Sequence, residues 1–123
     1  MFVGVLRLGF SIVGAQSLKD RRRVVRSFKE RVQNRFRVSA AEVGALEDPR
    51  RAWVAVAVVA NEAAHCHTVL EDVAAVASNL PDALLTDRAT EVVSYGFGGS
   101  GIQGGIEQAG GRLLQEGNED DEP

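Results

Sequence analysis

The sequence carries a dense run of cations in SLKDRRRVVRSFKERVQNR, residues 17–35. Eight of these nineteen residues are Lys or Arg, although the chain of 123 residues has a formal net charge of −3. Guanidinium and ammonium groups that share one surface can contact successive phosphates of a nucleic-acid backbone. The alternative interpretation is a solvated helix face that binds nothing.

The charge is divided unequally between the two halves of the chain. Residues 1–51 hold twelve Lys and Arg against five Asp and Glu, whereas residues 52–123 hold two against twelve. This asymmetry favours a charged partner or an acidic tail.

Other residues that could do chemistry are less promising. His65 and His67 flank Cys66, but on a helix the two imidazoles would point about 200° apart and could not share one ion. The segment 96–101 fits a dinucleotide-binding glycine pattern but lacks the helix and strand that should follow it. No nucleophile–base set or pair of carboxylates stands out. We therefore expect no metal, no cofactor and no enzymatic activity.

Hydrophobic periodicity predicts the elements that must position these residues. Alternation over 2–12 indicates a strand, and Ser17 with Asp20 resembles a capping box that opens a helix at Leu18. The remaining pattern predicts a strand over 37–46 and a strand over 52–60 that is apolar on both faces. It then predicts a helix capped by Asn61 and ended by Pro81, and a weaker strand within 84–95, most of it over 90–95.

This order, βαββαβ, predicts an α+β protein with a ferredoxin-like fold. Right-handed crossovers place both helices on one face of a four-stranded antiparallel sheet. We expect the domain to span residues 1–96. Residues 97–123, rich in glycine and acidic at their end, are expected to form a flexible tail.

A helical wheel separates the cations from the core face of the first helix. At about 100° per residue, one sector holds the apolar residues and another holds Lys19, Arg22, Arg23, Arg26 and Lys29. Arg21 falls on the core side. Cations in the first turns oppose the helix dipole at a cost of ~0.3–1 kcal/mol each, which favours a functional use of the stripe.

The same segments resemble a known family. SLKDRRRVVRSFKERVQNRF, RVSAAEV and RRAWVAVAVVAN are similar to motifs of the YlxP-like family of small bacterial proteins, over about residues 1–95. The resemblance implies a ferredoxin-like fold and, through neighbouring genes, a link to translation initiation and ribosome maturation. Two departures occur: Arg37 stands where the family usually has Asn, and Glu47-Asp48-Pro49-Arg50 replaces a stretch that usually carries an Asp and a Trp.

These observations predict an RNA- or ribosome-associated protein acting in ribosome maturation or translation, with ribosomal RNA or a ribosomal particle as partner. The candidate nucleic-acid-binding residues are Lys19, Arg22, Arg23, Arg26 and Lys29, extended by Arg35, Arg37, Arg50 and Arg51. Trp53 is expected to pack in the core or at a sheet edge, so recognition would rely on shape.

The alternative is a protein-interaction or self-association module, such as a homodimer, that uses the free sheet face with Val3, Val5, Ala55 and Ala57. One cysteine permits no internal disulfide, and the longest apolar run, 52–60, is too short to span a membrane. We therefore expect a cytoplasmic protein without membrane contact.

Overall fold

A computed structural model describes residues 1–44 and 47–96 of the chain. Its elements are β1 (Phe2–Ile12), α1 (Leu18–Phe36), β2 (Ser39–Val43), β3 (Arg51–Ala60), α2 (Ala63–Ser78) and β4 (Ala83–Ser94). Residues Phe2–Val93 form one compact unit, and Met1 belongs with the segment from Ser94 onward. In that second unit Tyr95 N donates to Met1 O at 2.7 Å. The predicted tail, residues 97–123, lies outside the described residues.

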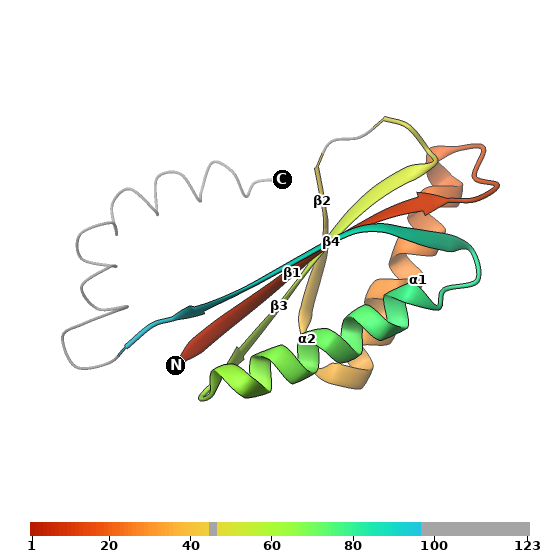
Figure 1. Ribbon diagram of the computed structural model, residues 1–123. Coiled ribbons are helices and arrows are strands. Elements are labelled where there is room, and N and C mark those ends of the chain that lie inside the picture. Colours follow the sequence, from red (N-terminus) through yellow and green to blue (C-terminus); the bar gives the residue numbers. More distant parts are fainter. Residues whose placement is uncertain (45–46, 97–123) are drawn as a thin grey trace. The chain divides into compact units, whose positions relative to one another are not determined.

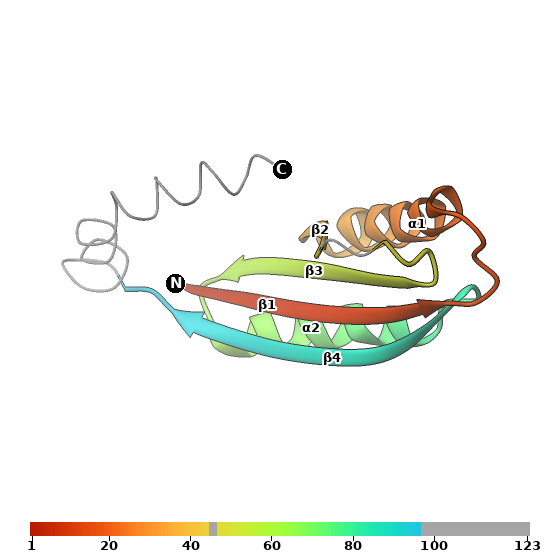
Figure 2. The same cartoon turned by 90° about the horizontal axis from the view of Figure 1, so that it is seen from above.

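The four strands form one sheet in the order β2-β3-β1-β4 (Figures 1 and 2). The two inner strands pair antiparallel, with Leu6 opposite Val56, and β2 pairs antiparallel with β3. Helix α1 packs against β2 and β3, whereas α2 packs against β1 and β3 on the same side. The predicted ferredoxin-like fold is therefore confirmed.

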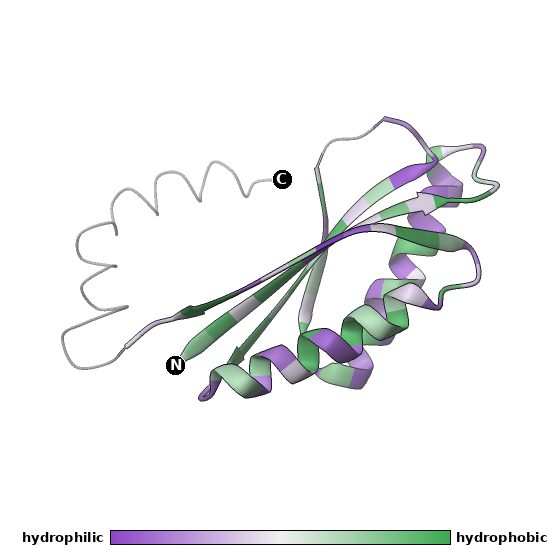
Figure 3. Ribbon diagram, in the orientation of Figure 1, coloured by the Kyte–Doolittle hydropathy of each residue, from purple (hydrophilic) through white to green (hydrophobic). Residues whose placement is uncertain are grey.

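The core lies between the helices and one face of the sheet. Even-numbered residues of the inner strands point into it, and Leu6, Leu8, Val54 and Val56 are fully buried. Phe28 of α1 reaches the same layer. Each such side chain contributes roughly 1.5–3 kcal/mol through its removal from water. In Figure 3 the strands carry hydrophobic stretches interrupted by polar residues, and hydrophobic and hydrophilic residues are mixed along α1.

Helix α1 begins where its capping residues predict. The Ser17 hydroxyl accepts a hydrogen bond from Asp20 N at 3.2 Å, which satisfies a backbone donor of the first turn. The Asp20 carboxylate accepts one from Gln16 N at 3.0 Å. That bond, assisted by the nearby Arg23 charge, lowers the pKa of Asp20. A carboxylate here also favours the positive end of the helix dipole.

The end of α1 corrects the predicted start of the second strand. Arg37 has a left-handed backbone (φ 56°) and donates its N–H to Gln33 O at 3.1 Å, which closes the helix. Strand β2 therefore begins only at Ser39 and ends at Val43, shorter than the predicted 37–46. The β-branched composition of this segment was misleading because a C-cap geometry overrides it.

We expect Arg37→Asn to stabilise the protein by about 0.5–1 kcal/mol. The Cβ of Arg37 is strained in the left-handed region, which asparagine tolerates better because its short amide side chain can hydrogen-bond to the local backbone. Urea unfolding followed by circular dichroism would measure the change. The neighbouring exposed Arg35→Asn, which lies inside the helix, should instead be neutral or destabilising. Equal effects at both positions would contradict the assignment to backbone strain.

Two further boundaries differ from the sequence prediction. Glu62, not Asn61, occupies the N-cap of α2, and its side chain makes no capping hydrogen bond. Strand β4 spans twelve residues rather than the predicted 90–95. Its first half contains Thr86, Asp87 and Arg88, and such polar residues are tolerated because β4 is an edge strand.

Candidate nucleic-acid interface

The outer face of α1 presents the predicted basic residues to solvent. The helix buries Val25, Phe28 and Val32 against the sheet. On other sides of the helix Lys19, Arg22, Arg23 and Arg26 are exposed, and Lys29 is half-buried. We call these five residues the basic stripe. Their exposure makes them available to a partner, and their binding role stays a prediction.

Three members of the basic stripe border one shallow hollow. Arg22, Arg26 and Lys29 lie around it together with Val25 and Glu42, and it encloses about 150 Å³. Three cations around one concave surface can surround a phosphate group. The one acid that lines the hollow, Glu42 of β2, is engaged by a different arginine.

That arginine is Arg21, which anchors the start of α1 to the sheet. Its side chain is only 10% exposed, and Nε lies 3.2 Å from Glu42 Oε2. Its Nη1 donates to Asp48 O at 3.4 Å and to Arg51 O at 3.5 Å. Arg21 therefore connects the helix to β2, to the turn before β3 and to β3 itself, as expected for a core-side residue.

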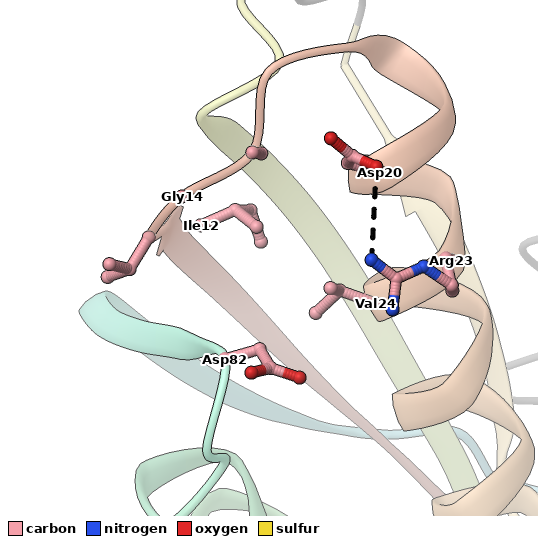
Figure 4. Close-up of a pocket in the computed structure, with 8 residues that line it drawn as sticks. Ile12, Gly14, Asp20, Arg23, Val24 and Asp82 are labelled. Atoms are coloured by element: carbon pink, nitrogen blue, oxygen red, sulfur yellow. Dashed lines mark ion pairs between the residues drawn. The ribbon is translucent and has the colours of Figure 1, made fainter.

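Arg23 lies on the opposite flank of α1, beside a second hollow of about 150 Å³ (Figure 4). Its Nη2 is 3.8 Å from Asp20 Oδ1, and Asp82 lines the same hollow. Both groups are open to solvent, so this ion pair contributes little stability. The acids nevertheless make Arg23 less available to a polyanion than its neighbours.

The other members of the basic stripe keep their charge uncompensated. Across residues 1–44 and 47–96, no ion pair includes Lys19, Arg22, Arg26 or Lys29. Uncompensated cations on one face produce a positive potential that attracts phosphates.

The structure separates the predicted extensions from the stripe. Arg35 stacks on Phe36, 5.0 Å from the ring centroid, and lines another hollow with Asp72 and Asn79 of the α2 side. Arg37 is the exposed C-cap. Arg50 pairs with Asp48 at 3.3 Å, and Arg51 is exposed on the sheet face that the helices leave open. None of these four lines the hollow of Arg22, Arg26 and Lys29.

The sequence predicted Trp53 in the core or at a sheet edge, whereas the structure places it on the open face of the inner strand β3. Odd-numbered residues of β3 point away from the helices, and Trp53 is half-buried on this open face. The guanidinium carbon of Arg7 in β1 lies 5.4 Å from the centroid of the Trp53 ring. The sequence misses this pair because β3 is apolar on both faces, so its pattern does not reveal which face the helices cover.

The residues around Cys66 match their predicted placement. Cys66 is buried with Sγ 3.9 Å from Phe2 O, while His65 and His67 are exposed. Within the part of the chain that the structure describes, no cluster of three or more His, Cys, Asp or Glu is placed to hold a metal ion. Neither α1 nor α2 combines the length and hydropathy needed to cross a membrane. Of the glycine pattern at 96–101, only Gly96 is among the described residues.

The fold and the exposed basic helix define a small ferredoxin-like protein with a candidate polyanion interface. The chain belongs to the family of proteins of unknown function DUF503, whose model matches residues 3–90. A search among curated proteins gave no match.

Two solved structures share the arrangement at low identity. One is a "putative Antibiotic biosynthesis monooxygenase" from Chloroflexus aurantiacus J-10-fl, with 14% identity, a TM-score of 0.47, and coverage of 80% of this chain and 98% of that chain. The other is the de novo designed ferredoxin-fold protein LFR1 1, with 12% identity, a TM-score of 0.46, and coverage of 80% and 91%. At such identities the likeness concerns the fold alone.

The first of these structures corrects one expectation. We expected a protein without enzymatic activity because the sequence shows no catalytic set. That expectation is corrected: the name of this neighbour belongs to an enzyme, so the lack of a catalytic motif here does not exclude enzymatic activity. Enzymatic function is not established by a 14% identity, and the missing motif does not establish its absence.

Proposed function

We propose that this protein binds structured RNA through the basic stripe of α1. The observation that carries the proposal is the group of Arg22, Arg26 and Lys29 around one hollow, uncompensated by ion pairs in the described residues. The resemblance to YlxP-like proteins supports ribosomal RNA or a ribosomal particle as the partner, in ribosome maturation or translation. Such a partner places the protein in the cytoplasm.

The energetics of α1 support a use for these cations. Lys19 stands in its first turn, where the helix dipole disfavours positive charge by ~0.3–1 kcal/mol, and Arg22 and Arg23 follow in the second turn, where the effect is weaker. Asp20 offsets part of this cost near the helix start. Since Lys19 and Arg22 form no ion pair in the described chain, a bound polyanion would supply the compensation that the fold does not.

A salt titration tests the proposal directly. Anisotropy of a labelled RNA hairpin should report binding whose log affinity falls linearly with log salt. Five phosphate contacts predict a slope of roughly −3.5 to −4.5, at about 0.7–0.9 per contact. Co-sedimentation with ribosomal particles at low salt, released at high salt, would identify the partner. Absence of binding at low salt, or a slope near zero, would overturn the proposal.

The open sheet face favours a second candidate, self-association. Val5 is 40% exposed and Val59 is 63% exposed on this face, and such apolar surface is typical of protein contacts. Light scattering at several concentrations would show a homodimer. We rank this second because α1 offers a defined partner chemistry, whereas the valines specify none.

A further inference from the structure

The open face of the sheet carries a planar side chain that the proposed function leaves unused. Trp53 is the only tryptophan of the chain, and it projects from β3 away from both helices. An indole on an open sheet face loses less water contact than a core residue and remains reachable by a ligand. Its surroundings determine which ligand fits.

Gly9 makes room for the indole. A Cβ at Gly9 of β1 would lie 2.8 Å from Trp53 Cζ3, closer than real Cβ atoms come, and 3.0 Å from Cη2. The six-membered edge of the ring therefore rests where any other residue would place a side chain. At the other end, a Cβ at Gly44 would lie 3.6 Å from Cδ1, an ordinary contact. The indole thus spans from the end of β2 to β1.

Arg7 adds a guanidinium, a second group on which a base can stack. Its guanidinium carbon is 5.4 Å from the Trp53 ring centroid, within the range of a cation–π contact. Its Nη2 is 3.5 Å from Asp87 Oδ2, which restricts where the guanidinium can turn. Arg7, Trp53, Val43 and Gly44 line a shallow hollow of about 370 Å³.

We propose that this hollow binds one unpaired base of a single-stranded RNA segment by stacking. Bases that are splayed out of a helix stack on aromatic rings and on arginine planes, and tryptophan and arginine here adjoin. Sheets of RNA-recognition motifs carry their stacking residues on one exposed face. Trp53 and Arg7 occupy β3 and β1, the two inner strands of this sheet.

The charges on the same face suit a phosphate next to the stacked base. Arg51 is exposed on the open face two residues before Trp53, opposite Ser11 of β1. No acid lines the hollow among the described residues, and Asp87 beside it is paired with Arg7. A strand that stacks one base on Trp53 can therefore place a neighbouring phosphate near Arg51.

A second copy of the chain fits the hollow less well than a base does. Self-association over Trp53 would require the second copy to supply acids for Arg7 and Arg51, because burying unpaired charges is costly. The exposed Val59 is six residues along β3 from Trp53, so a valine contact need not cover the hollow.

Short single-stranded RNA tests this site separately from the basic stripe of α1. The inference rests on the proposed function only in taking RNA as the ligand. Titration with a uridine hexamer should quench the fluorescence of Trp53, the sole tryptophan, in a saturable way. Trp53→Ala should weaken hexamer binding by about 5- to 150-fold, the range typical of one stacked base. Trp53→Phe should retain most of the affinity, and Val59→Ala, on the same face, should leave it unchanged.

Three results would overturn the stacking site. In the first, the hexamer binds the Trp53→Ala variant with the same affinity as the natural protein. In the second, it binds without quenching the fluorescence of Trp53. In the third, it does not bind at all. A dimer that Val59→Asp dissociates, without quenching by RNA, would assign the face to self-association instead. Binding of the hexamer but not of an RNA hairpin would overturn the proposed function of α1 and leave the stacking site standing.

Discussion

Replacing Arg21 by alanine should destabilise the domain by about 2–4 kcal/mol. The substitution leaves the Glu42 carboxylate without its guanidinium and frees two carbonyl acceptors, those of Asp48 and Arg51. Removing one partner of a buried ion pair costs about 3–5 kcal/mol. We expect slightly less here, because the Glu42 side chain is 28% exposed and water can reach it. Urea unfolding, followed by far-ultraviolet circular dichroism, would measure the loss.

The neighbouring Arg22→Ala is the matched control. Arg22 has the same side chain and occupies the same helical turn, but it is exposed and forms no ion pair in the described residues. Its loss should change stability by no more than about 0.5 kcal/mol. A double-mutant cycle with Glu42→Ala should show coupling of roughly 0.5–3 kcal/mol. Equal costs for Arg21 and Arg22 would contradict the anchoring role.

Arg21 also shows how far the sequence could predict the site. A helical wheel places it on the core side because apolar residues recur at helical spacing around it. The wheel cannot name its partners, since Glu42 and Asp48 are more than twenty residues away along the chain. Only the pairing of β2 with β3, Glu42 opposite Val54, brings that carboxylate under the start of α1.

The order of the elements was predictable because the longest ones have strong periods. Strand β1 alternates strictly, so its buried face could be assigned from sequence, and the Ser17 cap fixed the start of α1. The open-face pair of Arg7 and Trp53 was not predictable. Strand β3 is apolar on both faces, and its side chains could be assigned only through the register that puts Gly9 opposite Trp53.

The end of α1 was not predictable from the local sequence pattern, because the backbone conformation of one residue determines it. The left-handed Arg37 is not a glycine, so nothing in the local composition marks a helix end there. An asparagine at this position would suit the same backbone, because asparagine is enriched in the left-handed region. Arg37 therefore acts in helix termination through its backbone, whichever partner its exposed side chain meets.

The double substitution Arg22→Glu with Arg26→Glu should weaken RNA binding while leaving the fold intact. Both side chains are exposed, one helical turn apart, and both border the hollow that Lys29 completes. If each contacts one phosphate, the slope of log affinity against log salt should flatten by roughly 1.4–1.8 units. The introduced carboxylates should lower affinity further, because they would face the RNA phosphates beside Glu42.

The folded state should tolerate this change. Exposed substitutions shift stability by about 0.5 kcal/mol or less, and an acid at position 22 lies near the helix start, where the dipole favours negative charge. Circular dichroism and the urea midpoint would confirm that the variant is folded before binding is measured. Arg22→Ala and Arg26→Ala introduce no acid. If they also weaken RNA binding while remaining folded, the effect comes from lost contacts and not from lost structure.

Arg31→Glu is the matched control for Arg26→Glu. Both residues are exposed arginines of α1 and change the net charge equally, but Arg31 lies outside the basic stripe and lines hollows on the α2 side. If the position of the charge matters, Arg26→Glu should flatten the salt slope and Arg31→Glu should not. If net charge alone attracts RNA, the two variants should lose affinity equally. A folded double-reversal variant that keeps the natural slope and sediments with ribosomal particles over the same salt range would rule out the basic stripe.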